Sequence, residues 1–301
     1  MKRTTLFFII ILTCLPIAAQ DDLTDMMANY YAAKLHQDSI DISHLLTVYN
    51  YQCRTTDAEG NPVTDQMKLA LQVGTHCTRS YPYWKYQDDN EGMDHLSNGA
   101  MLQVRYDESY TFMPEIWTNY PDDRQTIRDA ILPKIYEANE PRISPKWTLT
   151  DDTLTVCGYS CKSATTFLHG RQWTAYYTEE IPSSAGPWKL CGLPGLILRA
   201  EDESRTHSFI AEIIKSDGAP IFYEHNAITI KISEKKLIKQ KSLTFGNRLY
   251  AKNPTYYIDI RNMAKTEDNV GATITGGKYV NIVNGIIEKD KAHVYQPLEM
   301  K

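Results

Sequence analysis

The sequence predicts an α+β, β-rich fold: a curved antiparallel sheet in the manner of a half-barrel, packed with one or two helices. Segments that alternate apolar and polar residues recur along the chain, and turn residues join them in pairs, as in successive hairpins. The composition holds 20 Tyr against 7 Phe, which favours strands with half-buried surfaces. Long segments with helical periodicity are few, so we expect the sheet to dominate.

Residues 1–20 have the layout of a secretory signal peptide. Basic residues at 2–3 precede an apolar run at 6–15, and Ala-Ala-Gln at 18–20 leads into acidic residues. The apolar run is about half the ~20 residues that a membrane-spanning helix needs. We therefore expect export and cleavage, without a lipid anchor at Cys14, because Thr precedes it where lipidation requires a small residue.

Residues 21–301 are expected to form one domain, because no repeat, low-complexity tract or Gly/Ser linker divides them. The segment 266–301 is rich in Gly and Asn and weak in periodicity, so we expect it to be poorly ordered. A net charge of −5 disfavours nucleic-acid partners, and no later segment is apolar enough to span a membrane. The predicted location is the periplasm or the periplasmic face of the envelope.

The first elements after the signal are a helix and a hairpin. Helical spacing of apolar residues predicts a helix over 21–37. Strands are predicted over 45–54 and 67–73, because apolar residues alternate there and turn residues fill 58–62. The segment 80–109 has weak periodicity and is predicted to be a loop or a short helical insertion.

The middle of the chain is predicted to be almost entirely β. Two strands, over 111–120 and 146–150, are separated by a segment that four prolines punctuate. Two further hairpins follow, which pair 153–167 with 173–178 and 196–200 with 208–213. Strand character continues over 228–232, and Ser233 is the predicted N-cap of a helix that runs to about Tyr250.

Catalytic and cofactor signatures are mostly absent from the sequence. It contains no Gly-x-Ser-x-Gly elbow and no His-Glu-x-x-His motif, and its eight His residues are dispersed. The run at 271–278 differs from a phosphate-binding loop, since its Lys falls one residue late and no Ser or Thr follows. We therefore predict no metal and no cofactor.

Cys157 and Cys161 form a Cys-x-x-x-Cys pair. In a regular strand such residues lie ~13 Å apart, too far for a disulfide or for one shared metal ion. A close arrangement requires a bulge or bend, which Gly158 permits. Disulfides to each other or to other cysteines, free thiols and a soft-metal site all stay open as interpretations.

A loop stiffened by prolines and freed by glycines joins the strand ending at 178 to the strand beginning at 196. Such a preorganised loop serves recognition or seals the end of a sheet beneath Trp188, and its composition favours the structural role. Its candidate site residues are Gly186, Pro187, Trp188, Gly192, Leu193, Pro194, Gly195, Leu196 and Ile197.

The run 192–197 spells the motif that names the GLPGLI family of exported proteins of Gram-negative bacteria. The residues around it also resemble that family, including Trp147, Cys157-Gly158-Tyr159, Gly170-Arg171 and Gly186-Pro187-Trp188-Lys189. The resemblance is specific over 147–200 and looser over the rest of the mature chain. It implies export and a shared fold, and the family has no agreed activity, substrate or catalytic residues.

The leading functional hypothesis is a non-enzymatic periplasmic binding or accessory protein. Its concave sheet face would hold an apolar small molecule or a segment of an envelope protein in an open pocket beneath Trp188. A structural or interaction protein of the outer envelope is the alternative. A hydrolase is the third hypothesis, and it requires a His such as His169 or His207 beside a carboxylate such as Glu179 or Glu180.

Overall fold

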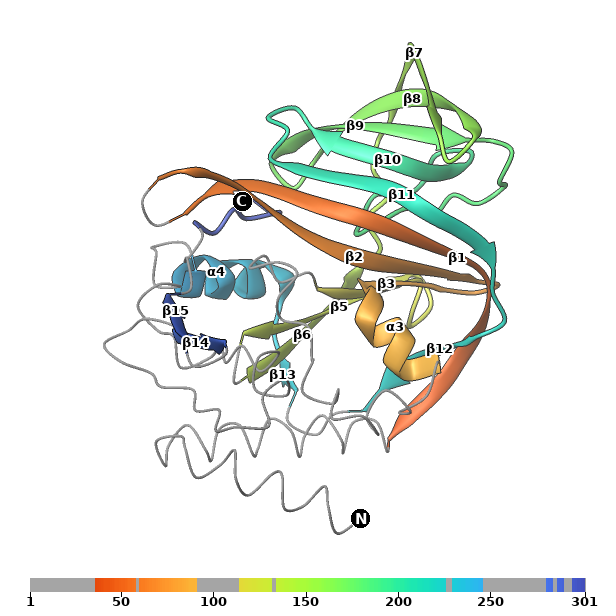
Figure 1. Cartoon of the computed structure of the whole chain (residues 1–301). Coiled ribbons are helices and arrows are strands. Elements are labelled where there is room, and N and C mark those ends of the chain that lie inside the picture. Colours follow the sequence, from red (N-terminus) through yellow and green to blue (C-terminus); the bar gives the residue numbers. More distant parts are fainter. Residues whose placement is uncertain are drawn as a thin grey trace.

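A computed structural model of the chain describes residues 36–57, 60–90, 114–131, 134–225, 229–245, 280–283, 286–289 and 294–300. In these residues a thirteen-stranded, mostly antiparallel sheet carries two short helices and does not close into a barrel (Figure 1). The predicted β-rich class is confirmed. Neither of the described helices is long and apolar enough to cross a bilayer.

Thirteen strands make up the main sheet: β1 (Gln37–Thr56), β2 (Pro62–Gly74), β3 (Thr78–Pro82), β4 (Glu115–Thr118), β5 (Arg124–Ile131), β6 (Lys134–Pro141), β7 (Thr148–Val156), β8 (Tyr159–Leu168), β9 (Arg171–Thr178), β10 (Leu196–Asp202), β11 (His207–Ser216), β12 (Pro220–Glu224) and β13 (Ile230–Lys231). Their order across the sheet is β13-β6-β5-β4-β3-β2-β1-β11-β10-β9-β8-β7, and β12 pairs separately with β1. The helices are α3 (Tyr83–Asn90) and α4 (Glu234–Phe245), and β14 (Val280–Val283) pairs with β15 (Ile286–Lys289) in a second sheet.

Strand β1 is the longest of the described strands and lies at the centre of the sheet. Its second half pairs with β2 on one side and with β11 on the other, where Leu45 faces Ser216. Its first half pairs with β12, where Gln37 faces Glu224. Register shifts interrupt all three ladders, and bulges of this kind bend a strand and increase its twist. The sheet therefore curves around β1 (Figure 1).

The two faces of the sheet bury different cores. The larger core joins alternate residues of β1 and β2, such as Tyr49 and Leu71, to β9, β10, β11 and the loop after β9. Leu237 brings α4 to the same core. On the opposite face, Leu46 and Val48 of β1 pack with Tyr86 of α3. The alternation that predicted the first hairpin thus sorts side chains between two buried faces.

A network of buried ion pairs, which we call the ion network, joins α3 to the strands on one side of β1. It comprises Arg79, Lys85, Glu115, Arg128, Glu137 and Glu224. Arg128 Nη2 lies 2.7 Å from Glu137 Oε2, and Lys85 Nζ lies 2.8 Å from Glu224 Oε1. The guanidinium groups of Arg79 and Arg128 lie over the Trp117 ring, with their Cζ atoms 5.0 and 4.9 Å from the ring centroid. Buried ion pairs therefore take part in the packing of α3 against these strands.

Several sequence predictions are confirmed by these elements. The first hairpin is β1–β2, and the third is β10–β11. Helix α3 is the short helical insertion expected within 80–109, and α4 begins directly after Ser233 as predicted. Most of the helix predicted over 21–37 lies outside the described residues, and its last residue, Gln37, begins β1.

Two other predictions, on the segment 153–167 and on the proline-punctuated segment, were wrong in detail. The strand predicted over 153–167 is two strands, because a two-residue turn at Cys157-Gly158 divides β7 from β8. The proline-punctuated segment contains the hairpin β5–β6, whose second strand ends at Pro141. Of the segment 266–301, the structure describes the hairpin β14–β15 and residues 294–300. The predicted signal peptide lies outside the described residues.

Candidate functional site

The loop between β9 and β10, which we call the motif loop (residues 179–195), folds back on itself by backbone hydrogen bonds. The Gly192 amide donates to Ser184 O at 2.8 Å, and the Ile197 amide donates to Ala185 O at 3.1 Å. Gly195 is required by close approach, because a Cβ there would lie 2.1 Å from Thr178 O. The predicted preorganisation of this loop therefore has a physical basis in its own hydrogen bonds and contacts.

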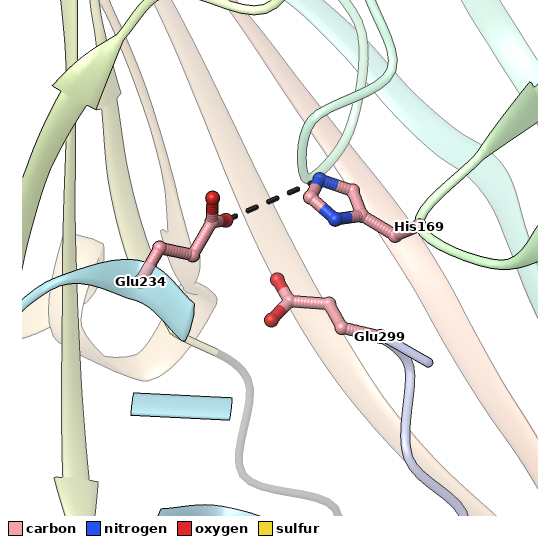
Figure 2. A group of neighbouring side chains, drawn as sticks. All are labelled: His169, Glu234 and Glu299. Atoms are coloured by element: carbon pink, nitrogen blue, oxygen red, sulfur yellow. Dashed lines mark ion pairs between the residues drawn. The ribbon is translucent and has the colours of Figure 1, made fainter. Parts of the chain in front are cut away.

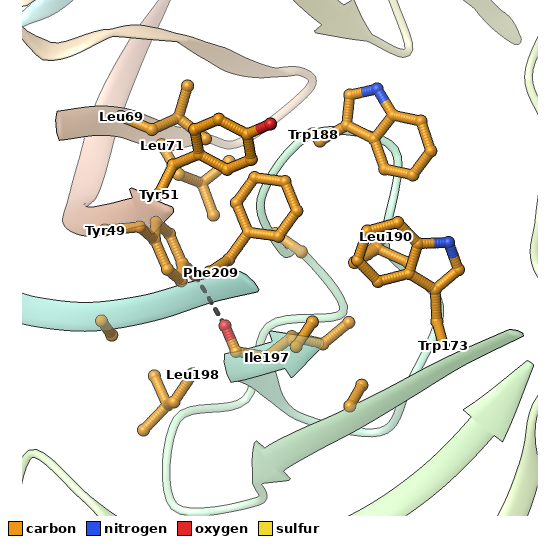
Figure 3. Close-up of a cluster of buried hydrophobic side chains, with 14 of the residues drawn as sticks. Tyr49, Tyr51, Leu69, Leu71, Trp173, Trp188, Leu190, Ile197, Leu198 and Phe209 are labelled. Carbon is orange, nitrogen blue, oxygen red and sulfur yellow. Dashed lines mark hydrogen bonds between the residues drawn. The ribbon is translucent and has the colours of Figure 1, made fainter. Parts of the chain in front are cut away.

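The apolar side chains of the motif loop point into the larger core. Trp188 is 2% exposed and its ring lies 5.5 Å from that of Trp173. Tyr49 Oη donates to Ile197 O at 2.6 Å and ties β1 to the end of the loop (Figure 3). Figure 3 shows Trp188 beside the side chains of Trp173 and Leu190. The predicted open pocket beneath Trp188 receives no support from this packing.

Lys189 belongs to the motif loop, and its side chain extends into a cluster of charged and polar groups. Its side chain is fully buried, and its ammonium contacts Oε1 of both Glu234 and Glu299. His169 Nε2 lies 4.0 Å from Glu234 Oε1. We call His169, Lys189, Glu234 and Glu299 the loop–strap cluster. Figure 2 shows the His169, Glu234 and Glu299 side chains directed toward one another from three separate segments.

Local structure positions His169 and Glu234. His169 has φ of 48° and forms the two-residue turn between β8 and β9 together with Gly170, whose φ is 79°. The His169 ring then lies 5.4 Å from the Trp188 ring. Glu234 is the first residue of α4, and its amide donates to Glu140 Oε1 at 2.9 Å. The β8–β9 turn and the start of α4 thereby face each other across the motif loop.

Residues 294–300, which we call the C-terminal strap, position Glu299. The Val294 amide donates to Thr56 O at 2.7 Å, and the Met300 amide donates to His169 O at 2.9 Å. Between these two points Arg171 Nη2 donates to Pro297 O at 2.6 Å. Leu298 is buried in the larger core. The strap therefore runs from the end of β1 to the β8–β9 turn and holds Glu299 against Lys189.

The electrostatics of the loop–strap cluster combine two carboxylates with one ammonium. Burial acts to raise the pKa of Glu299, but the nearby Lys189 and Lys241 ammonium groups overcome it and hold that pKa below its usual value. Burial and then Lys189 lower the pKa of His169, against the opposing effect of both glutamates. At neutral pH the cluster therefore offers a neutral His169 imidazole and an ionised Glu299 carboxylate.

This composition matches a metal-ligating set. One ligand atom from each of His169, Glu234 and Glu299 lies within 4.8 Å of the other two. Across the part of the chain that the structure describes, it is the sole group of three or more His, Cys, Asp or Glu residues with this geometry. The His169 Nε2 atom is buried and has no hydrogen-bond partner among the described residues.

The structure does not bring together the residue pairs of the hydrolase hypothesis. Glu179 pairs with the exposed Lys162 at 2.8 Å, and Glu180 Oε1 accepts a hydrogen bond from the Ser160 amide at 3.4 Å. His207 Nδ1 lies 2.8 Å from Tyr51 Oη in the buried core. The carboxylates near His169 come instead from Glu234 and Glu299, which lie far along the chain and carry no motif.

Cys157 lies in the β7–β8 turn and Cys161 lies in β8 just after it, at the bend that a close arrangement required. Cys157 is exposed and its Sγ donates to Ala211 O at 2.9 Å, whereas Cys161 is buried. Burial raises the pKa of both thiols. All five cysteines of the described residues carry free thiols. Protonated thiols are poor nucleophiles and poor ligands for soft metals.

One comparison with known proteins matches the motif loop to a sequence-family model. Residues 169–199, from the β8–β9 turn to β10, match the family described as "Protein of unknown function (Porph_ging)". No curated protein matches the chain.

Among solved structures, the chain is similar to two crystal forms of PNGF-II, in space groups P21 and C2. The sequence identity is 13% in both cases, with TM-scores of 0.43 and 0.41. The likeness covers 65% and 64% of this chain and 32% of each PNGF-II chain, so the chain spans about a third of the length of the proteins it matches. Likeness of this degree says nothing about activity.

Proposed function

We propose that the chain is a GLPGLI-type exported protein that binds a ligand or partner in the periplasm or at the periplasmic face of the envelope, without catalysing a reaction. Its sequence supports export, through the signal-like residues 1–20, and the family resemblance, through the motif at 192–197. The match of residues 169–199 to a family of unknown function agrees with the second point.

The loop–strap cluster carries the proposal. Four side chains from four separate segments converge there, and one of them belongs to the motif loop. His169, Glu234 and Glu299 each keep between 11% and 14% of the side chain exposed, so solvent reaches the cluster. Ligand sites use a small number of convergent polar groups to fix the orientation of the ligand and to provide specificity.

The same cluster favours a polar ligand over an apolar one. The space next to Trp188 holds the protein's own side chains, while the cluster presents two carboxylates to one ammonium. A ligand that carries positive charge complements this arrangement. Enzymatic chemistry gains little support, because Lys189 already contacts both carboxylates and the cluster contains no hydroxyl or thiol nucleophile.

Native mass spectrometry tests the proposed function. The protein is purified from the envelope fraction of the cells that make it, as the wild type and as Glu299→Gln, with Glu179→Gln as the matched control because Glu179 lies in an exposed pair. We expect a bound species on the wild type and the control that Glu299→Gln retains less well. A wild type that carries neither a bound species nor an envelope protein contradicts the proposal.

A hydrolase, the third hypothesis from the sequence, is a further candidate because His169 faces two carboxylates and could work with one of them as an acid–base pair. A panel of ester, amide and glycoside substrates distinguishes the candidates. Turnover by the wild type that is lost in His169→Asn would favour the hydrolase. Asn suits this position because it tolerates the positive φ of the turn.

A further inference from the structure

We propose that His169, Glu234 and Glu299 form the binding site of one divalent transition-metal ion of the zinc class. This inference rests on the binding function proposed above and names the chemical class of its ligand. It goes beyond the sequence, which predicts no metal site, because its three donors lie on segments that no sequence motif connects.

The donor set determines the class of ion. One imidazole nitrogen and two carboxylate oxygens suit zinc and similar first-row ions, whereas magnesium and calcium prefer oxygen donors alone. The three ligand atoms lie within 4.8 Å of one another, so small side-chain rotations bring them to one ion at ~2.0–2.2 Å.

His169 is the donor that points most clearly to an ion. Its Nε2 atom is buried without a hydrogen-bond partner, although buried polar atoms rarely stay unpaired. The backbone of the same residue is held in place, since His169 O accepts the Met300 amide at 2.9 Å. The ring is therefore directed at the two glutamates by a turn and a strap that are both anchored.

The Lys189 ammonium marks the position in this cluster at which a positive charge is bound. Its ammonium contacts Oε1 of both glutamates, so a cation is accommodated between them. Lys241, near Glu299, is itself paired with Asp129, so two ammonium groups face three carboxylates and the remaining negative charge attracts a further cation. The ammonium also repels a metal ion at the same place, so we expect Lys189 to limit the affinity for zinc.

Isothermal titration calorimetry of the complete exported chain with zinc chloride tests the site. We expect one zinc ion per chain and no comparable heat with magnesium chloride. His169→Asn and Glu234→Gln should each weaken zinc binding at least about tenfold. His225→Ala is the matched control, because His225 lies in an exposed pair with one carboxylate, Asp38, at 2.8 Å.

A second variant strengthens the test. Lys189→Met removes the competing charge and should tighten zinc binding by about tenfold or more. If Lys189→Met does not fold, the two weakening variants decide alone, with circular dichroism as the check of folding. Zinc should also raise the melting temperature of the wild type but not that of His169→Asn.

Two results would overturn the metal site. Zinc that binds the wild type and His169→Asn with equal affinity binds elsewhere, and a wild type that takes up no zinc has no such site. The proposed binding function would survive either result if native mass spectrometry still shows a different bound species. The two experiments therefore fail independently.

Discussion

The residue type at some positions of the motif loop is fixed by the room available for a side chain as much as by its chemistry. Gly195 leaves no room for a Cβ, because the Thr178 carbonyl oxygen would lie 2.1 Å from it and backbone cannot move aside. Gly218, by contrast, has open space around its Cβ position. We expect Gly195→Ala to lower the free energy of unfolding by about 3 kcal/mol and Gly218→Ala to change it little. Urea unfolding of both variants measures the difference, and equal losses would contradict the argument.

His207 makes stability depend on pH. Burial and then Arg171 lower its pKa to about 3, so the folded protein keeps it neutral where the unfolded chain binds a proton. The stability that this lowered pKa contributes is fully present above about pH 6.5, the pKa of His in the unfolded chain, and is lost as the pH falls toward 3. Unfolding titrations between pH 7 and pH 5 should show this slope, at up to about 1.4 kcal/mol per pH unit. His207→Gln should reduce the slope, and His169→Asn should reduce it in the same direction.

At the level of residues, the motif loop could be predicted from the sequence better than the loop–strap cluster could. Prolines and glycines in 182–195 indicate a stiff loop with close contacts, and Trp188 is the natural residue to seal it. Glu299 could not be found this way, because it lies in a segment without periodicity. The contact of Glu299 with Lys189 depends on where the strap crosses the sheet, and no local pattern encodes such a crossing.

At the scale of elements, the C-terminal strap packs into the larger core through Leu298. Leu298 is buried in the larger core, whereas Leu243 of α4 is 51% exposed. We expect Leu298→Ala to cost about 2–4 kcal/mol and Leu243→Ala less than about 0.5 kcal/mol. Thermal unfolding compares the pair, and hydrogen exchange at the Met300 amide reports whether the strap detaches first. Unchanged exchange in Leu298→Ala would mean that polar contacts alone hold the strap.

The errors in element prediction have identifiable causes. The four prolines between 121 and 145 favour a break between strands, yet Pro141 ends β6 and leaves the β5–β6 ladder intact up to that residue. The prediction of one strand over 153–167 missed a turn, because Cys157 takes a positive φ of 50° that Asn or Gly usually takes. Hairpins with ordinary turn residues, such as β10–β11, were predicted correctly because their turns are recognisable.

At the scale of the whole molecule, the ion network ties stability to acid pH. Burial acts to raise the pKa of Glu115, but Lys85, Arg79 and Arg128 outweigh it and hold that pKa at about 2. Arg128 likewise leads the groups that hold the pKa of Glu137 low against burial. Stability from these carboxylates is complete above the unfolded Glu pKa of about 4.3 and is lost as the pH falls toward 2. Unfolding titrations over that range should show a steep decline.

Substitution of one residue of the ion network tests how much the network contributes to the free energy of unfolding. Arg128→Met leaves Glu137 without its guanidinium partner, which lies at 2.7 Å, and should cost about 3–5 kcal/mol. Lys162→Met removes one partner of an exposed pair with Glu179 and should cost less than about 1 kcal/mol. Chemical unfolding at pH 7 measures both. Equal effects would show that burial does not decide the contribution of these charges.

The pairing of β1 has a consequence for how the molecule assembles. One neighbour, β2, follows β1 closely in the chain, but the other, β11, begins only at His207, and β12 comes later still. The first hairpin can therefore form early, while the ladder that joins the two halves of the sheet must wait until most of the chain is present. Such remote pairing slows folding. Until it is complete, β1 exposes an unpaired edge, which makes the half-assembled chain a natural client for chaperones.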